Sequence, residues 1–426
     1  MYALASTALW RFMVACVVIP VLLAGFTAKA VADPLSFNEA LAIAERSTPT
    51  LKASAAQEDA ARASAIPAGA LPDPKLVLGI DNLPIDTGDR FSLSRDFMTM
   101  RRIGIMQDFP NQDKRAARVE VAKGRVAVAE AQTQITRLSV LRETAVAWIG
   151  RDTVEQELAY IDALSAENRL LDAAVRARLA GGKGMTAETI APRQEAALID
   201  ERRDALEARR SQAIAALKRW IGPAANAPLQ GQAPEWPITR EILQHRLHQH
   251  PEIAYFDSKA DELNAEIKEA QAEKKSDWSL ELAYQKRGPQ FSDMVSLQAS
   301  FDLRLFTGTR QDPMIAAKRA ERIGLDAERE ATLREHSAML ESDLADFERL
   351  TNALKRQRDV LLPLAEEKVQ LAMADWQGGK GSLSDVIMAR RERIDAKLKL
   401  IEISGERSQM AARLYYAYGE PAGEKP

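Results

Sequence analysis

The chain is poor in the side chains that most often carry out catalysis or bind metals. Its 426 residues include one cysteine and four histidines. The cysteine, Cys16, lies in an apolar run near the N-terminus, so a chain without this run has neither disulfides nor thiolate ligands. The sequence also lacks a nucleophile elbow, a nucleotide-binding glycine loop and a zinc signature. These absences predict a protein that is not an enzyme and holds no cofactor, and the net charge of −3 argues against nucleic acid as a partner.

The N-terminal segment has the composition of a secretory signal. Arg11 provides a positive flank, and residues 12–26 form an uncharged apolar run that is short for a membrane-spanning helix. Small residues at the cleavage spacing predict that residues 1–32 are removed after Ala32. The alternative is an uncleaved membrane anchor.

One short phrase, Gly-Gly-Lys-Gly, occurs twice. Its two copies are Gly181, Gly182, Lys183 and Gly184, and Gly378, Gly379, Lys380 and Gly381. The two copies stay in register in the residues that follow. Glu188 corresponds to Asp385, Arg193 to Arg390 and Glu195 to Glu392. A register shared through a following amphipathic segment indicates an internal duplication.

A second set of matches extends the duplication to the start of each half. Glu39, Leu41 and Pro49 in the first half correspond to Glu241, Leu243 and Pro251 in the second. We therefore divide the chain into a signal peptide (1–32), a first repeat (33–222), a proline-rich linker (223–237), a second repeat (238–419) and a C-terminal tail (420–426).

The hydrophobic period changes from helical to alternating in two predicted hairpins. Their strands are expected at about 75–82 and 98–109, and at about 278–287 and 294–305. In the first hairpin, Ile103 and Ile105 share one face, while Arg102 and Gly104 share the other. The length of these runs is close to the roughly 9–11 residues that cross a bilayer as a tilted strand. A β-sandwich strand alternates in the same way, but the chain lacks the further strands of a sandwich, so we predict membrane strands.

A long helix is predicted after each hairpin. Residues 112–179 contain no proline, and about 65 helical residues extend roughly 100 Å. In the second copy, Leu333, Leu340, Phe347, Leu354 and Leu361 recur every seven residues, which is typical of coiled-coil packing.

Two hairpins supply four strands, which are too few to close a barrel. A sheet in lipid must close, because its edge groups cannot be hydrated there, and closed barrels have at least about eight strands. The chain is therefore expected to share a barrel with copies of itself, and the residues alone allow a dimer, a trimer or a larger ring.

This organisation resembles the TolC family of outer-membrane efflux channels. The resemblance covers nearly the whole chain after the signal and rests on the openings around Pro49 and Pro251, the strand exit at 302–308 and the tip at 379–390. It implies a mainly α fold with a membrane β-barrel: a homotrimer with a twelve-stranded barrel, four strands per chain, on a coiled-coil α-helical tunnel. It further implies the outer membrane of a Gram-negative bacterium, contact with its lipid, and two partners, a periplasmic adaptor protein and an inner-membrane pump.

A narrower resemblance concerns residues 306–313 and 315–321. They are similar to the CzcC branch of the family, which serves heavy-metal pumps of the resistance–nodulation–division type. This similarity implies a passive exit duct for heavy-metal cations, without naming the metal.

The resemblance also implies roles for residues at the tip. The eight residues of the two Gly-Gly-Lys-Gly copies are implied to dock the adaptor. Asp385 and its counterpart Glu188 are implied to line the entrance constriction, where a ring of carboxylates concentrates cations. The family's second acid is replaced by Met388 here, and Lys380 is the nearest basic residue. The alternative is that both acids only stabilise helix N-termini.

Two other sets of side chains suggest metal binding, and we expect ordinary roles for both. His245, His248 and His250 have ligand-like spacing, but only Glu252 is nearby to complete the set, so a structural or solvated role is expected. Three methionines, Met98, Met100 and Met106, share one parity of a predicted strand and would suit Cu(I), but packing is the usual role of methionine.

The competing interpretation of the whole chain is a soluble periplasmic coiled-coil adaptor or scaffold protein. It does not account for the alternation between Trp278 and Leu305, because a soluble scaffold has no use for a strand face that is apolar over five successive positions.

Overall fold

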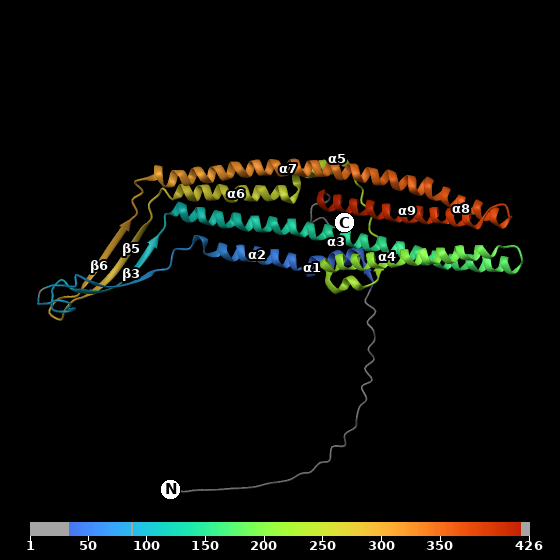
Figure 1. Cartoon of the computed structure of the whole chain (residues 1–426). Coiled ribbons are helices and arrows are strands. Elements are labelled where there is room, and N and C mark those ends of the chain that lie inside the picture. The colour runs from blue at the N-terminus through green and yellow to red at the C-terminus, as the bar shows by residue number, and fades with distance from the viewer. Residues whose placement is uncertain (1–33, 87, 419–426) are drawn as a thin grey trace, which may run out of the picture.

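The computed structural model describes residues 34–86 and 88–418. The predicted signal peptide (1–32), its cleavage after Ala32 and the predicted tail (420–426) lie outside the described residues. Figure 1 shows an elongated molecule in which long helices run side by side and a small sheet stands at one end. The described part of the chain is mainly α-helical, as its periodicity predicts.

Long helices make up most of the molecule. The helices are α1 (Phe37–Ser47), α2 (Pro49–Ala65), α3 (Gln112–Ala180), α4 (Ile190–Ile221), α5 (Arg240–Arg246), α6 (Pro251–Ala272), α7 (Gln311–Arg356), α8 (Leu362–Gln377) and α9 (Leu383–Tyr418). The longest, α3, has 69 residues and therefore extends roughly 100 Å. It packs along α2, α4, α6 and α9, so both halves of the chain share one helical body. Among the described residues, no helix is both long enough and apolar enough to span a membrane.

Each half begins with two helices separated by a proline. Pro49 is the first residue of α2, and Pro251 is the first residue of α6. Proline suits this position because the N–H that it lacks would have no partner in the first turn of a helix. The second helix of the first half therefore begins at Pro49 itself.

The predicted heptad seam is interrupted near its end. Leu340 is buried, but Leu361, the last member of the series, is 50% exposed. Between them the chain forms one turn of π-helix, Gln357–Leu361, before α8 begins. Pro363 follows, and it has no N–H for the carbonyl group four residues earlier. The wider turn rotates the apolar stripe, so Leu361 is not buried within this chain.

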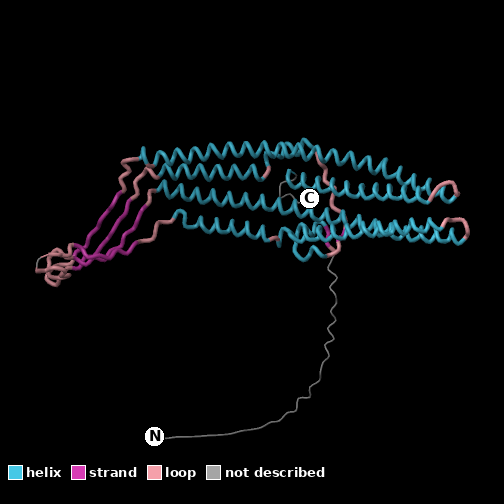
Figure 2. The backbone as a smooth tube through the Cα atoms, viewed as in Figure 1, coloured by secondary structure: helices cyan, strands magenta, loops and turns pink. Residues whose placement is uncertain are grey.

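Four strands form one antiparallel sheet at the end of the molecule opposite the two helix-joining turns (Figure 2). Their order is β2 (Lys75–Asp81), β3 (Met100–Phe109), β5 (Trp278–Lys286) and β6 (Met294–Phe301). Each half contributes one hairpin, and β3 pairs with β5, which places Ile103 opposite Tyr284 and Ile105 opposite Leu282. Within the described residues, β2 and β6 are the edges of this sheet.

The last predicted strand is shorter than expected. β6 ends at Phe301 rather than at about 305. The N–H of Asp302 donates to the carbonyl of Asp277 (3.0 Å), and Arg304 Nη2 lies 3.4 Å from the Asp277 carboxylate. Lys114 of α3 binds the same carboxylate at 3.1 Å. The backbone bond continues the register of the last ladder pair, Trp278 with Phe301, and the contact with Lys114 fastens the sheet to α3.

The predicted linker (223–237) also contributes to the packing of the first repeat. It contains the short strand β4 (Leu229–Gln230), which pairs in parallel with β1 (Leu35–Ser36). Trp236 then packs edge-on against Phe37, which also contacts Trp148 of α3, with ring centroids 5.6 and 5.5 Å apart. The largest apolar core therefore lies where the start of the first repeat, α3 and the linker meet.

Candidate functional site

One face of the sheet carries exposed apolar side chains in rows that cross all four strands. The first row is Leu76, Ile105, Leu282 and Leu297, and the second is Leu78, Ile103, Tyr284 and Val295. Their exposed fractions lie between 43% for Tyr284 and 70% for Val295. A monomeric soluble protein rarely leaves such a continuous apolar surface in water, so this face indicates a contact with an apolar environment.

The opposite face of the sheet is polar and centres on an ion pair. Arg102 of β3 pairs with Glu281 of β5, and both side chains are largely buried. Gly104 makes room for this pair, since an added Cβ would lie 3.0 Å from a carboxylate oxygen of Glu281 and 2.9 Å from the Cβ of Ala283. The alternation of apolar and polar residues in the sequence therefore describes two chemically distinct faces.

The two Gly-Gly-Lys-Gly turns lie together at the other end of the molecule (Figure 1). Each one ends a helix: the N–H of Gly181 donates to the carbonyl of Ala177 (3.0 Å), and that of Gly378 donates to Ala374 (2.9 Å). The second glycine of each turn has a positive φ, 68° at Gly182 and 73° at Gly379. Glycine adopts this conformation without steric cost. The repeated phrase is therefore a helix stop and turn, and its role in docking an adaptor stays a prediction.

The two predicted aperture acids lie just after these turns, where they cap the returning helices. The carboxylate of Asp385 accepts the hydroxyl (2.7 Å) and the N–H (3.1 Å) of Ser382, whose hydroxyl oxygen accepts the N–H of Asp385 in return (3.2 Å). The hydroxyl of Ser382, followed by its N–H, lowers the pKa of Asp385 below the usual range, which keeps it ionised at neutral pH. Glu188 likewise accepts the N–H of Met185 at 3.2 Å. Both acids thus have the capping role of the alternative interpretation, and an additional role in an aperture stays a prediction.

Trp376, which the sequence analysis did not single out, joins the two tips. Its indole N–H donates to Glu188 of the first repeat (3.4 Å). Arg178 lies over its ring, 4.4 Å from the centroid, and donates to its carbonyl (2.8 Å). The counterpart of Trp376 in the first repeat is Leu179. An aromatic residue at only one of two matching tips is therefore the signal that could have identified this contact.

A buried ion pair joins the repeats farther from the tip. Arg390 of α9 contacts Glu195 of α4 at 3.2 Å and Glu167 of α3 at 3.1 Å. Arg390 is 1% exposed and Glu195 is 2% exposed. In the sequence, Arg390 and Glu195 are noticeable only as matching positions of the duplication. Their spatial pairing fixes α9 against α3 and α4.

The histidines cluster differently from their spacing in the sequence. His250 lies against His336 of α7, with tilted rings whose centroids are 4.3 Å apart, and His336 Nε2 lies 2.8 Å from a carboxylate oxygen of Glu252. His245 and His248 lie outside this group, so the ligand set suggested by the sequence spacing is wrong. Burial, followed by the charge of His336, lowers the pKa of His250 to about 4, so His250 is neutral at pH 7.

The three methionines do not form one site. Met100 and Met106 lie in β3, six residues apart, and a strand of that length spans about 20 Å. Met98 precedes the strand, because its N–H bonds the carboxylate of Asp96 (2.7 Å) instead of a neighbouring strand. The predicted start of this strand at about 98 is therefore two residues early, and the three sulfur atoms cannot share one ion.

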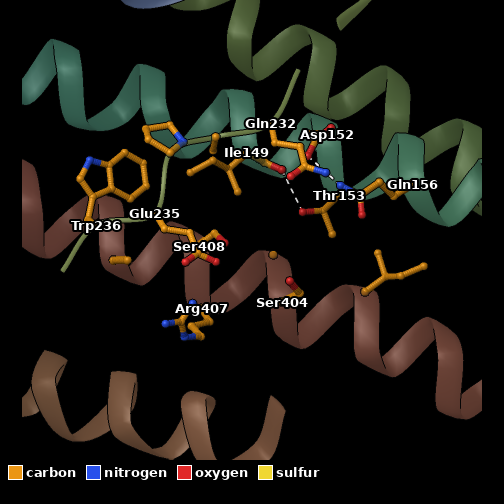
Figure 3. A pocket seen from close by; sticks show the side chains of 15 residues that line it. Ile149, Asp152, Thr153, Gln156, Gln232, Glu235, Trp236, Ser404, Arg407 and Ser408 are labelled. Carbon is orange, nitrogen blue, oxygen red and sulfur yellow. Dashed lines mark hydrogen bonds between the residues drawn. The ribbon is translucent and has the colours of Figure 1, made fainter. Parts of the chain in front are cut away.

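A polar cavity of about 190 Å³ lies between α3, α9 and residues 232–236 (Figure 3). Gln156 donates to the carboxylate of Asp152 (2.8 Å). Burial nevertheless raises the pKa of Asp152. The hydroxyl of Thr153 donates to the carbonyl of Ile149 in its own helix (2.9 Å). This hydroxyl is therefore not activated by a neighbouring base, and we assign the cavity no catalytic role.

Comparison with known proteins gives matches only in structure. No protein-family model matches the chain, and no curated protein matches it in sequence. The outer membrane protein VceC from Vibrio cholerae matches with a TM-score of 0.73 and 18% identity, over 90% of this chain and 96% of that chain. CusC, described for its transmembrane channel formation, matches with a TM-score of 0.75 and 16% identity, over 92% of this chain and 94% of that chain.

A third solved structure agrees with these two. The open state of the MtrE outer membrane channel from Neisseria gonorrhoeae matches with a TM-score of 0.71 and 17% identity, over 90% of this chain and 88% of that chain. All three likenesses cover nearly the full length of the proteins compared. The chain therefore has the fold of these outer-membrane proteins.

Proposed function

We propose that the chain is one subunit of a passive outer-membrane channel of the TolC family. The observation that carries the proposal is the sheet face with two exposed apolar rows, which runs without interruption from β2 to β6. In lipid, exposed apolar side chains lie in their preferred environment, and the polar face around Arg102 and Glu281 then borders a water-filled interior.

The free sheet edges support an assembly of several copies. β2 and β6 each lack a second neighbour within the described chain. An unpaired edge is not tolerated in the hydrocarbon layer, so β6 of one copy pairs with β2 of the next. A homotrimer of this kind has a twelve-stranded barrel, with four strands from each copy.

The remaining parts of the proposal concern location and partners. In this proposal the predicted signal would direct the chain to the periplasm, and the sheet would insert into the outer membrane of a Gram-negative bacterium. The sequence has no nucleotide-binding loop, so a partner must drive transport. A periplasmic adaptor docks on the two glycine turns and connects the channel to an inner-membrane pump of the resistance–nodulation–division type.

Heavy-metal cations are the proposed cargo. Residues 306–313, which resemble the CzcC branch, form the turn before α7 and the start of this helix. Asp385 is held ionised at the tip, and a ring of such acids favours the entry of cations. The pump selects the substrate, so a deletion strain grown on zinc, cobalt, cadmium, copper or silver salts identifies the metal.

The soluble adaptor or scaffold is the less favoured alternative. Such a protein would expose both apolar rows of the sheet to water, where patches of this kind promote aggregation. The nearly full-length likeness to outer-membrane proteins also favours the channel.

Cell fractionation with a matched pair of variants tests the proposal. Leu297 lies on the apolar face and its neighbour Gln298 lies on the polar face of the same strand. A lysine in the lipid costs about 2–4 kcal/mol near the middle of the bilayer. We therefore expect Leu297→Lys to deplete the chain from the outer-membrane fraction, while wild type and Gln298→Lys remain there. Recovery of the wild type in the soluble periplasm, or equal behaviour of the two variants, would contradict the membrane face.

A further inference from the structure

A cluster of two histidines and one glutamate stands apart from the sheet and the tips. His250 caps the N-terminus of α6 and Glu252 lies in its first turn, while His336 projects from α7. Tyr418, at the end of α9, contacts the same group. The cluster lies near the middle of the molecule, where α6 begins and α9 ends (Figure 1). It therefore connects three helices that are distant in the sequence.

The distances within the cluster suit a small metal ion. One potential ligand atom from each of His250, Glu252 and His336 lies within 4.8 Å of the others. Tetrahedral zinc has bonds of about 2.0–2.2 Å to nitrogen and oxygen, which separates its ligands by roughly 3.4 Å. The contact of 2.8 Å between His336 Nε2 and Glu252 is slightly shorter than this separation, so small side-chain rotations admit an ion.

We propose that His250, Glu252 and His336 bind a divalent transition cation of the zinc class. Two imidazoles and one carboxylate form a borderline ligand set that suits zinc, nickel and copper(II) better than magnesium or calcium. Water supplies the fourth ligand, because the Glu252 side chain is 45% exposed while His336 is 12% exposed. This site goes beyond the proposed channel function and does not depend on it.

The surroundings of His336 support metal binding. His336 Nδ1 lies 3.3 Å from the hydroxyl of Tyr418, which also donates to the carbonyl of His336 (3.3 Å). When Nε2 binds the ion, Nδ1 carries the proton and donates a hydrogen bond to the hydroxyl oxygen of Tyr418. Such a hydrogen bond orients metal-binding histidines. Buried leucines, Leu340 and Leu414 among them, pack on Tyr418 and shield the inner side of the cluster.

Two features oppose the ion and set a limit on its affinity. His250 Nδ1 accepts the N–H of Glu252 at 3.2 Å. Coordination through Nδ1 displaces this hydrogen bond directly, and coordination through Nε2 requires the ring proton on Nδ1, which also removes it. Arg142 is near enough for its positive charge to act on His250 and Glu252. We therefore expect weaker binding than in a closed structural zinc site.

The bound ion would hold α6, α7 and α9 together. These helices otherwise meet in this region through apolar contacts, the bond between His336 and Glu252, and the contacts of the Tyr418 hydroxyl with His336. An ion that binds only the folded chain stabilises it by mass action. Zinc is thus expected to raise the melting temperature as well as to bind.

The test uses the untagged, chelator-treated chain in detergent, titrated calorimetrically with Zn²⁺ alone. We expect one ion per chain and a rise in melting temperature, and with Co²⁺ the visible absorption of a nitrogen- and oxygen-ligated ion. Glu252→Gln and His336→Gln should each abolish saturable binding. Tyr418→Phe removes only the outer contact and should weaken binding about 10–100-fold.

His245→Gln combined with His248→Gln is the matched control, because it removes two histidines outside the cluster. This control should bind zinc like the wild type. Glu252 is half-exposed, so its glutamine variant also serves as the ligand variant that preserves folding, which far-UV circular dichroism checks. The proposal is overturned by the absence of saturable binding at one ion per chain, by unchanged binding in folded Glu252→Gln, or by loss of binding in the control.

Discussion

At the scale of single residues, the buried charges between the repeats are the most sensitive points of the fold. Arg390 and Glu195 are almost completely buried and contact each other at 3.2 Å. Their counterparts in the duplication, Arg193 and Glu392, do not form the corresponding pair, since Glu392 binds Lys368 at the surface (2.6 Å). The two repeats therefore match in sequence but use the matching positions differently.

Glu195→Gln leaves the charge of Arg390 buried with only the half-exposed Glu167 as its carboxylate partner. Removing one member of a buried ion pair typically costs about 3–5 kcal/mol. Chemical unfolding followed by circular dichroism should show a decrease in the free energy of unfolding at the lower end of this range, because Glu167 still pairs with Arg390.

Glu392→Gln is the matched control at the corresponding position of the second repeat. Its pair with Lys368 is exposed on both sides, and such pairs contribute about 0–1 kcal/mol. Equal decreases in the free energy of unfolding for Glu195→Gln and Glu392→Gln would show that the buried pair stabilises the fold no more than the exposed pair does.

Asp152 allows a prediction of pH dependence. Burial raises its pKa in the folded chain, so folding favours the protonated carboxyl group. The associated stability is fully present below the pKa of the unfolded chain, about 3.9, and is lost as the pH rises through the folded pKa. Asp152→Asn mimics the protonated form, so it should raise the melting temperature at pH 7. The same substitution should change it little near pH 3. An equal rise in melting temperature at both pH values would show that the effect of Asp152→Asn does not come from the titration of Asp152.

A glycine pattern such as the one at each tip is typical of a helix stop, but it does not specify the contacts that hold the tip. The glycine pattern predicts a stop and a turn from local backbone preference alone, and Gly182 and Gly379 adopt the conformation that favours glycine. The contact between Trp376 and Glu188 joins residues of different repeats, and no local pattern specifies it. The pair of Arg390 with Glu195 escaped prediction for the same reason.

At the scale of elements, the acids at the starts of the returning helices have a capping role that must be separated from any role in permeation. Asp385→Ala and Glu188→Ala remove the charge together with the cap, and the loss of a cap costs about 0.5–2 kcal/mol. Asp385→Asn and Glu188→Gln keep a side-chain acceptor and remove only the charge. The Asp385→Asn and Glu188→Gln variants are therefore the ones that test a role of the charges in permeation.

In planar bilayers, the Asp385→Asn and Glu188→Gln double variant should be less cation-selective than the wild type with a similar conductance. The alanine double variant should in addition conduct more, because the helix starts loosen. Reversal potentials in a salt gradient measure the selectivity. Unchanged reversal potentials in both double variants would remove these acids from the constriction.

The strands and helices show which features of the fold the hydrophobic period of the sequence predicts and which it does not. Alternation identified the two faces of the sheet, because a strand has only two faces and side chains alternate between them. It did not identify the start of β3, which follows the contact of the Met98 N–H with Asp96, or the end of β6 at Phe301. The heptad count likewise did not indicate the π-turn near Pro363, where proline provides no backbone donor.

At the scale of the whole molecule, the duplication determines the architecture. Two copies of a hairpin and two long helices place both hairpins at one end and both glycine turns at the other (Figure 2). The sequence predicted this arrangement of helices and strands. It did not predict that β3 and β5 join the hairpins into one sheet, nor that β4 in the linker pairs with β1. These pairings connect residues far apart in the chain, and their register depends on three-dimensional packing.

The central claim is that copies of this chain form a conducting pore, and single-channel recording in planar bilayers tests it most directly. Trp376→Leu places in the second tip the residue that the first tip has at the same position, and it removes the indole contact with Glu188. It should therefore loosen the entrance without altering the sheet. We predict discrete, cation-selective conductance steps for the wild-type protein and larger steps for Trp376→Leu. A bilayer that stays at its baseline conductance with both folded proteins would contradict the account.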